Sequence, residues 1–313
     1  MAPQLQSAAD AVLPRLTEQQ AGLSAVFAQI GSVMNVSSVS KTPLPEPVKQ
    51  VMQQILGLRL QPQGDGFSGK SIEAAVKNSG LFREAALLGA GKQAQGSDLK
   101  SLLLNLKSLL TDFGAKAAPF KPLVQTPVPS LKRSPQGERP ASAAISSEAG
   151  DTKAALNRLL QDTDAALSRI RLGQMVSRGL GGDDPVVQGR AMDVTLDLPL
   201  AVGDQTAVLQ LQIGRDPEQD GAEDEEGGAW RLRFALDLTE TGPMEAAVSL
   251  RGGGTYVSLW VDRGDTLERF SENRESLEAT FAHAGLDLRE LRFLRGLPRR
   301  TEARFGAVVD RQS

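Results

Sequence analysis

A glycine-rich octapeptide, Gly64–Ser71 (GDGFSGKS), matches the whole P-loop pattern GxxxxGK[ST]. In a nucleotide-binding loop of this kind, backbone N–H groups hold the phosphates, Lys70 contacts the β- and γ-phosphate oxygens, and Ser71 binds magnesium. That chemistry needs a buried strand directly before the glycines, whereas the preceding Leu56–Gln63 is short and is interrupted by Pro62. We therefore favour a glycine-rich loop that leads into a helix at Ser71, with a P-loop nucleotide-binding protein as the alternative.

Two other sets of ionisable residues suggest chemistry but have simpler explanations. The acidic run Asp216–Glu226 lacks the ligand spacing and the terminal bidentate glutamate of an EF-hand, so we interpret it as a solvated loop between strands. His283 has no nucleophile or carboxylate partner in a recognisable motif, and a histidine near a helix end ordinarily interacts with the terminal carbonyls. One histidine and no cysteine exclude a multi-histidine or thiolate metal site. We predict no catalytic residue, no cofactor and no metal, and hence no enzyme.

Basic residues gather near the C-terminus, at Arg289, Arg292, Arg295, Arg299, Arg300 and Arg304. The ordinary interpretation of such a cluster is a solvated basic face. The functional interpretation is a docking surface for an acidic patch on a partner, through steering and charge-assisted hydrogen bonds. Because the spacing of the first three arginines does not follow strict strand alternation, the sequence does not assign them to one face.

Composition and charge limit the classes of protein that fit. A chain of 313 residues suits two domains with linkers. The formal net charge of -3 leaves no broad basic surface, which argues against nucleic-acid binding. No apolar stretch approaches the roughly 18 residues that a membrane span needs, and the N-terminus lacks the pattern of a Sec signal peptide. We expect a cytoplasmic protein without membrane insertion that, if exported, uses a route without a cleaved signal.

The first 180 residues divide into four segments by composition. Residues 1–47 combine a weak helical period, interrupted by Pro14, with a Ser- and Pro-rich stretch, and predict a flexible segment. Residues 48–114 predict a small helical domain, whose strongest apolar stripe is Leu99, Leu102, Leu103, Leu106, Leu109 and Leu110. Six prolines among polar residues predict a disordered linker over 115–150. An amphipathic helix is predicted over 151–180.

From 181 to 297 the period changes from helical to alternating. The alternation predicts a hairpin around the turn at 202–205, and then a three-strand meander over 230–238, 244–250 and 256–261. A helix follows from Asp265 or Thr266 to Ala284, Gly285 is its expected C-terminal cap, and a last strand covers 286–293. Residues 298–313 read as a loose tail. The predicted fold class is α+β: a helical N-terminal part, and a C-terminal two-layer domain with a mainly antiparallel sheet and one packed helix.

The segment Trp230–Phe293 resembles the C-terminal domain of flagellar hook-length control proteins. A strand of alternating leucines leads to the turn Leu238–Glu245 (LTETGPME), a valine-containing return strand and another strand follow, and the helix ends in Ala284-Gly285-Leu286. The family's usual leucine before the turn glycine is Thr241 here. Three upstream pieces are similar to members of the same family: 196–216, 78–88 and 98–106.

The resemblance implies a binding protein of the flagellar type III export system. Its C-terminal domain would contact the cytoplasmic domain of the export gate and switch secretion from rod-and-hook subunits to filament subunits. The N-terminal half would sample hook and hook-cap proteins, and the chain itself would be an export substrate. An adaptor domain unrelated to secretion is the further alternative. The residues expected to contact the partner are Leu238, Glu240, Gly242, Pro243, Glu245, Arg289, Arg292 and Arg295.

Overall fold

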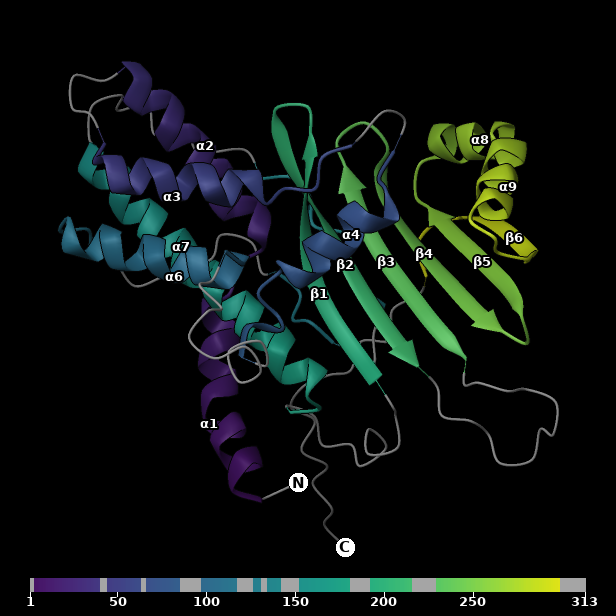
Figure 1. The fold of residues 1–313 in the computed structure, drawn as a ribbon, viewed down its shortest axis with the longest axis horizontal. Coiled ribbons are helices and arrows are strands. Elements are labelled where there is room, and N and C mark those ends of the chain that lie inside the picture. The colour runs from purple at the N-terminus through teal and green to yellow at the C-terminus, as the bar shows by residue number, and fades with distance from the viewer. Residues whose placement is uncertain are drawn as a thin grey trace, which may run out of the picture.

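In the computed structural model, helices gather on one side of the molecule and a six-stranded sheet forms the other (Figure 1). The structure describes residues 3–39, 44–62, 66–84, 97–116, 126–130, 134–141, 152–180, 192–215 and 229–298. Helices precede the sheet in the chain, and two more helices lie between its last two strands. The α+β class predicted from the sequence is confirmed.

The described helices of the first 180 residues are α1 (Pro3–Gln19), α2 (Leu23–Val39), α3 (Glu46–Gly57), α4 (Gly69–Lys77), α6 (Leu99–Asp112) and α7 (Thr152–Ser177). Of these, α2, α3, α6 and α7 share one apolar core, whereas α4 packs against the sheet. Asp98 caps α6, because its carboxylate accepts a hydrogen bond from Ser101 N at 3.0 Å. Five of the six residues in the predicted α6 stripe are buried, and the sixth, Leu109, is half-buried. Helix α7 packs against α1, α2 and α6, and thus joins the predicted helical domain instead of standing apart from it.

Residues 3–39 form two helices, which corrects the prediction of a flexible N-terminal segment for this range. Pro14 lies inside α1 and does not end it. Helix α2 has no charged residue, and its Leu23, Val26, Phe27 and Ile30 are at most 2% exposed. Because most positions from Leu23 to Val33 are buried, the helix has little polar face and the helical period in its sequence is weak.

The strands are β1 (Met192–Val202), β2 (Gln205–Arg215), β3 (Trp230–Leu238), β4 (Gly242–Arg251), β5 (Gly254–Val261) and β6 (Leu288–Arg295). Their order in the sheet follows the sequence. The pairs from β1 to β5 are antiparallel, and β6 runs parallel to β5. The alternation in the sequence correctly predicts each strand, with boundaries that move by a few residues.

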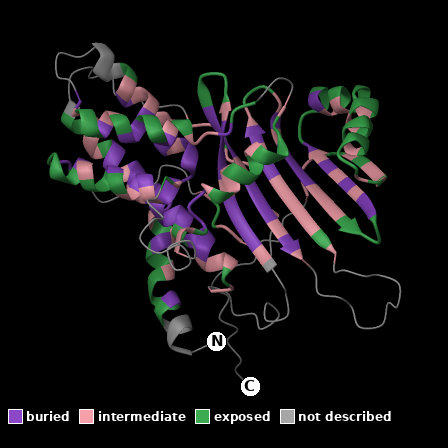
Figure 2. Cartoon of the chain, viewed as in Figure 1, coloured by how far each residue is buried: buried purple, intermediate pink, exposed green. Residues whose placement is uncertain are grey.

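Each face of the sheet has its own chemistry because side chains alternate along a strand. One face, here called the leucine face, contains the cross-strand row Leu196, Leu211, Phe234, Ala246, Leu259 and Phe293. The other, here called the polar face, contains the adjacent row Asp197, Gln210, Ala235, Glu245, Trp260 and Leu294. Helix α4 covers the leucine face near β1, while α7 covers the polar face there. Figure 2 shows that the buried strand residues are continuous with the buried faces of the helices.

The predicted single helix after β5 is a pair, α8 (Gly264–Glu272) and α9 (Arg274–His283). The break falls at Asn273, whose side-chain amide donates to the Arg269 carbonyl at 2.8 Å and so offers the end of α8 an alternative to the continued helix. Leu267 and Phe270 of α8 pack on the leucine face against β4, β5 and β6. Gly285 ends α9 with φ +73°, as predicted.

Residues 126–130 and 134–141, here called the strap, fall inside the predicted disordered linker but lie against the polar face and the helices. Gln20 donates to the Thr126 carbonyl at 2.6 Å, and the Gln136 backbone N–H donates to Gln210 Oε1 at 3.0 Å. Glu138 forms an antiparallel bridge with Val208 of β2. The expectation of disorder therefore does not hold for these two stretches. Residues 117–125, 131–133 and 142–150 of the predicted linker lie outside the described part of the chain.

Candidate partner-binding surface

The turn between β3 and β4 is held by the start of α8. Leu238 ends β3 half-buried, the Glu240 side chain is exposed, and Pro243 follows the first residue of β4. Arg263 Nη1 donates to the Glu240 carbonyl at 2.8 Å, and Thr266 Oγ1 donates to the Thr241 carbonyl at 2.9 Å. Fixing the backbone carbonyls of Glu240 and Thr241 lowers the entropy cost of presenting this turn to a partner.

Glycine is required at the first position of β4. Gly242 is buried and has φ +73°, and a Cβ placed there would lie 2.6 Å from the Cδ atom of Arg263. Side-chain-bearing residues are strained at this φ, and the Arg263 stem occupies the space that the Cβ would need. The family pattern indicates Gly242 but not Arg263, because an arginine shortly before a predicted helix start is only a weak signal.

The predicted contact residues do not form one patch. Glu245 is 3% exposed beneath the polar face, which removes its carboxylate from the accessible surface. Arg295, at the end of β6, is opposite Val261, and Val261 is opposite Met244 of β4. Two strand spacings, or about 10 Å, thus separate Arg295 from the β4 end of the turn. The structure brings Leu238, Glu240, Gly242, Pro243 and Arg295 to one end of the sheet.

The other two arginines of β6 lie farther along the strand. Arg289 is near its start and pairs with Asp287 at 2.6 Å, while Arg292 lies in its middle on the polar face and pairs with Glu290 at 2.5 Å. Arg295 is exposed and forms no ion pair with any described residue. The predicted arginine cluster is therefore spread along β6. Its members Arg299, Arg300 and Arg304 lie outside the described residues, as does the acidic run 216–226.

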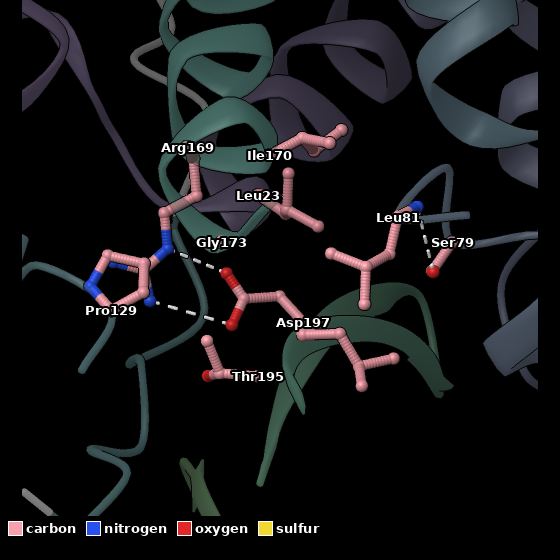
Figure 3. A pocket seen from close by; sticks show the side chains of 10 residues that line it. Leu23, Ser79, Leu81, Pro129, Arg169, Ile170, Gly173, Thr195 and Asp197 are labelled. Carbon is pink, nitrogen blue, oxygen red and sulfur yellow. Dashed lines mark hydrogen bonds and ion pairs between the residues drawn. The ribbon is translucent and has the colours of Figure 1, made fainter. Parts of the chain in front are cut away.

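A buried ion pair joins the helices to the sheet. Arg169 of α7 is 2% exposed, and its Nε atom lies 2.7 Å from Asp197 Oδ2 of β1 (Figure 3). Its Nη1 atom also donates to Gln20 Oε1 at 3.0 Å and to the Pro127 carbonyl of the strap. The small hollow beside this pair has room for about one water molecule, so it is no binding pocket for an organic ligand.

Glu138 of the strap places a second carboxylate near this pair. Its Oε1 atom accepts hydrogen bonds from the backbone N–H of Ser24, at 3.2 Å, and from the Ser24 hydroxyl. Its Oε2 atom is shielded from solvent and has no hydrogen-bond partner among the described residues. The pKa of Glu138 is raised to about 7, chiefly by burial and also by the nearby charge of Asp197, against the opposing effects of Ser24 and Arg169. No sequence motif indicates Arg169 or Glu138.

The P-loop alternative is not favoured by the surroundings of the motif. Helix α3 and a single bridged residue, Leu60, come before it in the described part of the chain, in place of a buried strand. Ser68 caps α4 by accepting from Ser71 N at 3.1 Å, and the Ser71 hydroxyl donates back to the Ser68 carbonyl at 2.7 Å. Ser71 thus serves the helix start, as the favoured interpretation predicted. Lys70 is exposed.

Other features of the described ranges do not form a recognisable site. His283 lies exposed in the last turn of α9, at the predicted helix end. No group of three or more histidine, aspartate or glutamate residues in these ranges could hold a metal ion. No described helix combines the length and the apolar character that crossing a membrane requires.

Residues 218–301 match the family described as Flagellar hook-length control protein FliK. This range contains β3, the β3–β4 turn, β4, β5, α8, α9 and β6, and the match agrees with the resemblance over Trp230–Phe293. It leaves out the helical part, the strap and the β1–β2 hairpin. No curated protein and no solved structure gives a significant match to the chain. The family similarity is confirmed for the C-terminal segment, and the three upstream similarities stay predictions.

Proposed function

We propose that the protein controls flagellar hook length by binding the cytoplasmic domain of the export gate, and that this contact switches secretion from rod-and-hook to filament subunits. The observation that carries the proposal is the family match over residues 218–301. That range coincides with a continuous run of elements, β3 to β6 with α8 and α9. The family is named for hook-length control, so we assign the chain a binding role without a reaction.

The end of the sheet that contains the β3–β4 turn is the best candidate for the gate contact. The Glu240 side chain is exposed there on a backbone held by Arg263 and Thr266, and the exposed Arg295 lies nearby. Exposed charges on a preorganised backbone favour specific recognition, because little ordering is needed on binding.

The helical part takes the sensing role in this proposal, with hook and hook-cap proteins as its partners and the type III route as its path of export. The helical part contacts the sheet directly: α7 packs on β1, and Arg169 of α7 bonds to both Asp197 and the strap. A change in the helices would therefore alter contacts on the sheet next to β3.

The test compares two glycine variants in binding to the purified cytoplasmic domain of the export gate. Gly242→Ala strains a positive φ and meets Arg263, whereas Gly253→Ala at the β4–β5 turn strains a similar φ of +70° in open space. The strained φ should cost about 1 to 2 kcal/mol of folding free energy in each variant, and the displacement of Arg263 adds to the cost only in Gly242→Ala. We expect only Gly242→Ala to weaken binding, by about tenfold in Kd, measured by calorimetry. Absence of binding by the unaltered chain would remove the proposal.

A further inference from the structure

The two edges of the sheet differ. At the β1 edge, another segment of the chain occupies the end of the strand: Leu60 N donates to the Pro199 carbonyl at 2.8 Å, and Ala201 N donates to the Leu60 carbonyl at 2.9 Å. At the opposite edge, β6 is the last strand of the sheet, and no described segment pairs with its outer side. Unpaired N–H and C=O groups on an edge strand form a template for another strand.

The register of β6 identifies the outward backbone groups. Gly296 N donates to the Val261 carbonyl at 2.8 Å, and Arg295 is the residue opposite Val261. In a parallel ladder, the N–H and C=O of the directly opposite residue point away from the neighbouring strand. The outward groups therefore belong to Arg295 and, at steps of two, to Phe293 and Leu291. Arg274 Nη1 donates to the Leu291 carbonyl at 3.1 Å, as expected for a carbonyl on this side.

The side chains along this edge are cationic with one apolar spot. Arg295 has no acidic partner among the described residues, and the Arg292 side chain is 62% exposed although it pairs with Glu290. Leu294, 36% exposed, lies on the polar face opposite Trp260. Arginines on an edge strand disfavour pairing with an identical strand, because like charges would meet. The same charges favour an incoming strand that carries carboxylates.

We propose that the outer edge of β6 binds an extended, carboxylate-bearing segment of a partner protein, which adds to the sheet as a seventh strand. Backbone hydrogen bonds to Phe293, Arg295 and the Leu291 N–H hold this segment, since the Leu291 carbonyl already accepts from Arg274. Its carboxylates opposite Arg292 and Arg295 select it. The identification of the partner as the export gate rests on the proposed function. Arg295 belongs both to this edge and to the end with the β3–β4 turn, so one partner can reach both.

The test measures amide hydrogen exchange by NMR in the isotope-labelled full chain, with and without the purified cytoplasmic domain of the export gate. In the complex, we expect exchange at Leu291, Phe293 and Arg295 to slow by about tenfold or more, since these N–H groups gain partners. The amides of Arg292 and Leu294 face β5 and serve as internal controls that change little.

A pair of charge reversals completes the test. Arg295→Glu should weaken the complex by about five- to tenfold. The matched control is Arg178→Glu, which makes the same charge change at an exposed position just after α7, on the side of the β1 edge, and should leave binding unchanged.

The possible results separate the two proposals. A complex that forms without slower exchange at the outward amides overturns the edge proposal and leaves the proposed function standing. No complex at all removes both. Slow exchange of the outward amides in the free chain, together with a dimer in sedimentation, would show that a second copy occupies the edge and would also overturn the proposal.

Discussion

Replacing Glu138 by glutamine should change how the stability of the protein depends on pH. The Glu138 pKa rises from an ordinary value of 4.5 to about 7 in the folded protein, mainly because its carboxyl group is buried. Between these two values the folded chain keeps a proton that the unfolded chain has lost. The free energy of unfolding therefore falls as pH rises through this window, and the stabilising proton is fully in place only below it.

The size of the effect follows from the shift. A shift from 4.5 to about 7, at about 1.4 kcal/mol per pKa unit, corresponds to about 3 kcal/mol. Glutamine keeps an oxygen that can accept from Ser24 but cannot ionise, so Glu138→Gln should lack this dependence. The variant should match the natural protein near pH 4 and exceed its stability by up to about 3 kcal/mol near pH 8.

Urea unfolding followed by circular dichroism at several pH values provides the assay. The difference between the two proteins isolates Glu138, because other carboxyl groups with raised pKa values, such as Asp162 and Asp237, are present in both. Glu240→Gln is the matched control, since it removes an exposed carboxylate. Parallel pH profiles for the natural protein and Glu138→Gln would refute the placement of this carboxylate in a buried site.

Two further changes test the contacts between the strap, the helices and the sheet. A Cβ at Gly137 would lie 2.7 Å from the backbone carbon of Leu236. Gly137→Ala should therefore displace the strap and lower the unfolding free energy, measured by urea titration, by about 1 to 3 kcal/mol. The control Gly57→Ala has open space and should change the unfolding free energy by less than about 1 kcal/mol. Arg169→Ala leaves Asp197 buried without its cation and should lower the unfolding free energy by about 3 to 5 kcal/mol. The double change Arg169→Met with Asp197→Leu should recover most of that loss. If Arg169→Ala alone were as stable as the natural protein in thermal melts, the buried ion pair would be contradicted.

Sequence patterns predict the sheet well because strand alternation and short hairpin turns involve only residues that are close together in the chain. Alternation along Trp230–Leu238 fixes which side chains face the core, and short hairpins place neighbouring strands in the sheet in the order of the sequence. The break at Asn273 escaped prediction, since the apolar spacing on both sides of it fits one continuous helix.

Contacts between residues far apart in sequence were not predictable in this way. Ser24 and Glu138 are separated by 114 residues, and Gln20 and Thr126 by 106, so no local period records them. The proline content of the strap signals only that it forms no helix; its order depends on acceptors and donors that the helices and β2 supply. The helical period of α2 is weak for the opposite reason, because burial of most positions from Leu23 to Val33 leaves little polar face.

The candidate surface was predicted in part. The family pattern identified the β3–β4 turn, but no local pattern indicates that Arg263 and Thr266 hold it. The family pattern includes Glu245 with the turn, but the alternation of β4 places this side chain on the polar face, where it is buried. The arginines of β6 lie close together in the sequence, but the strand spreads them over its length and both faces.

Electron microscopy of hook–basal bodies from a strain that lacks this gene is the decisive test of a role in hook-length control. We expect over-long hooks without filaments, restored to normal length by the natural gene and by Gly253→Ala but not by Gly242→Ala. Hooks of normal length on normally motile cells would contradict a role in hook-length control, whatever the protein binds.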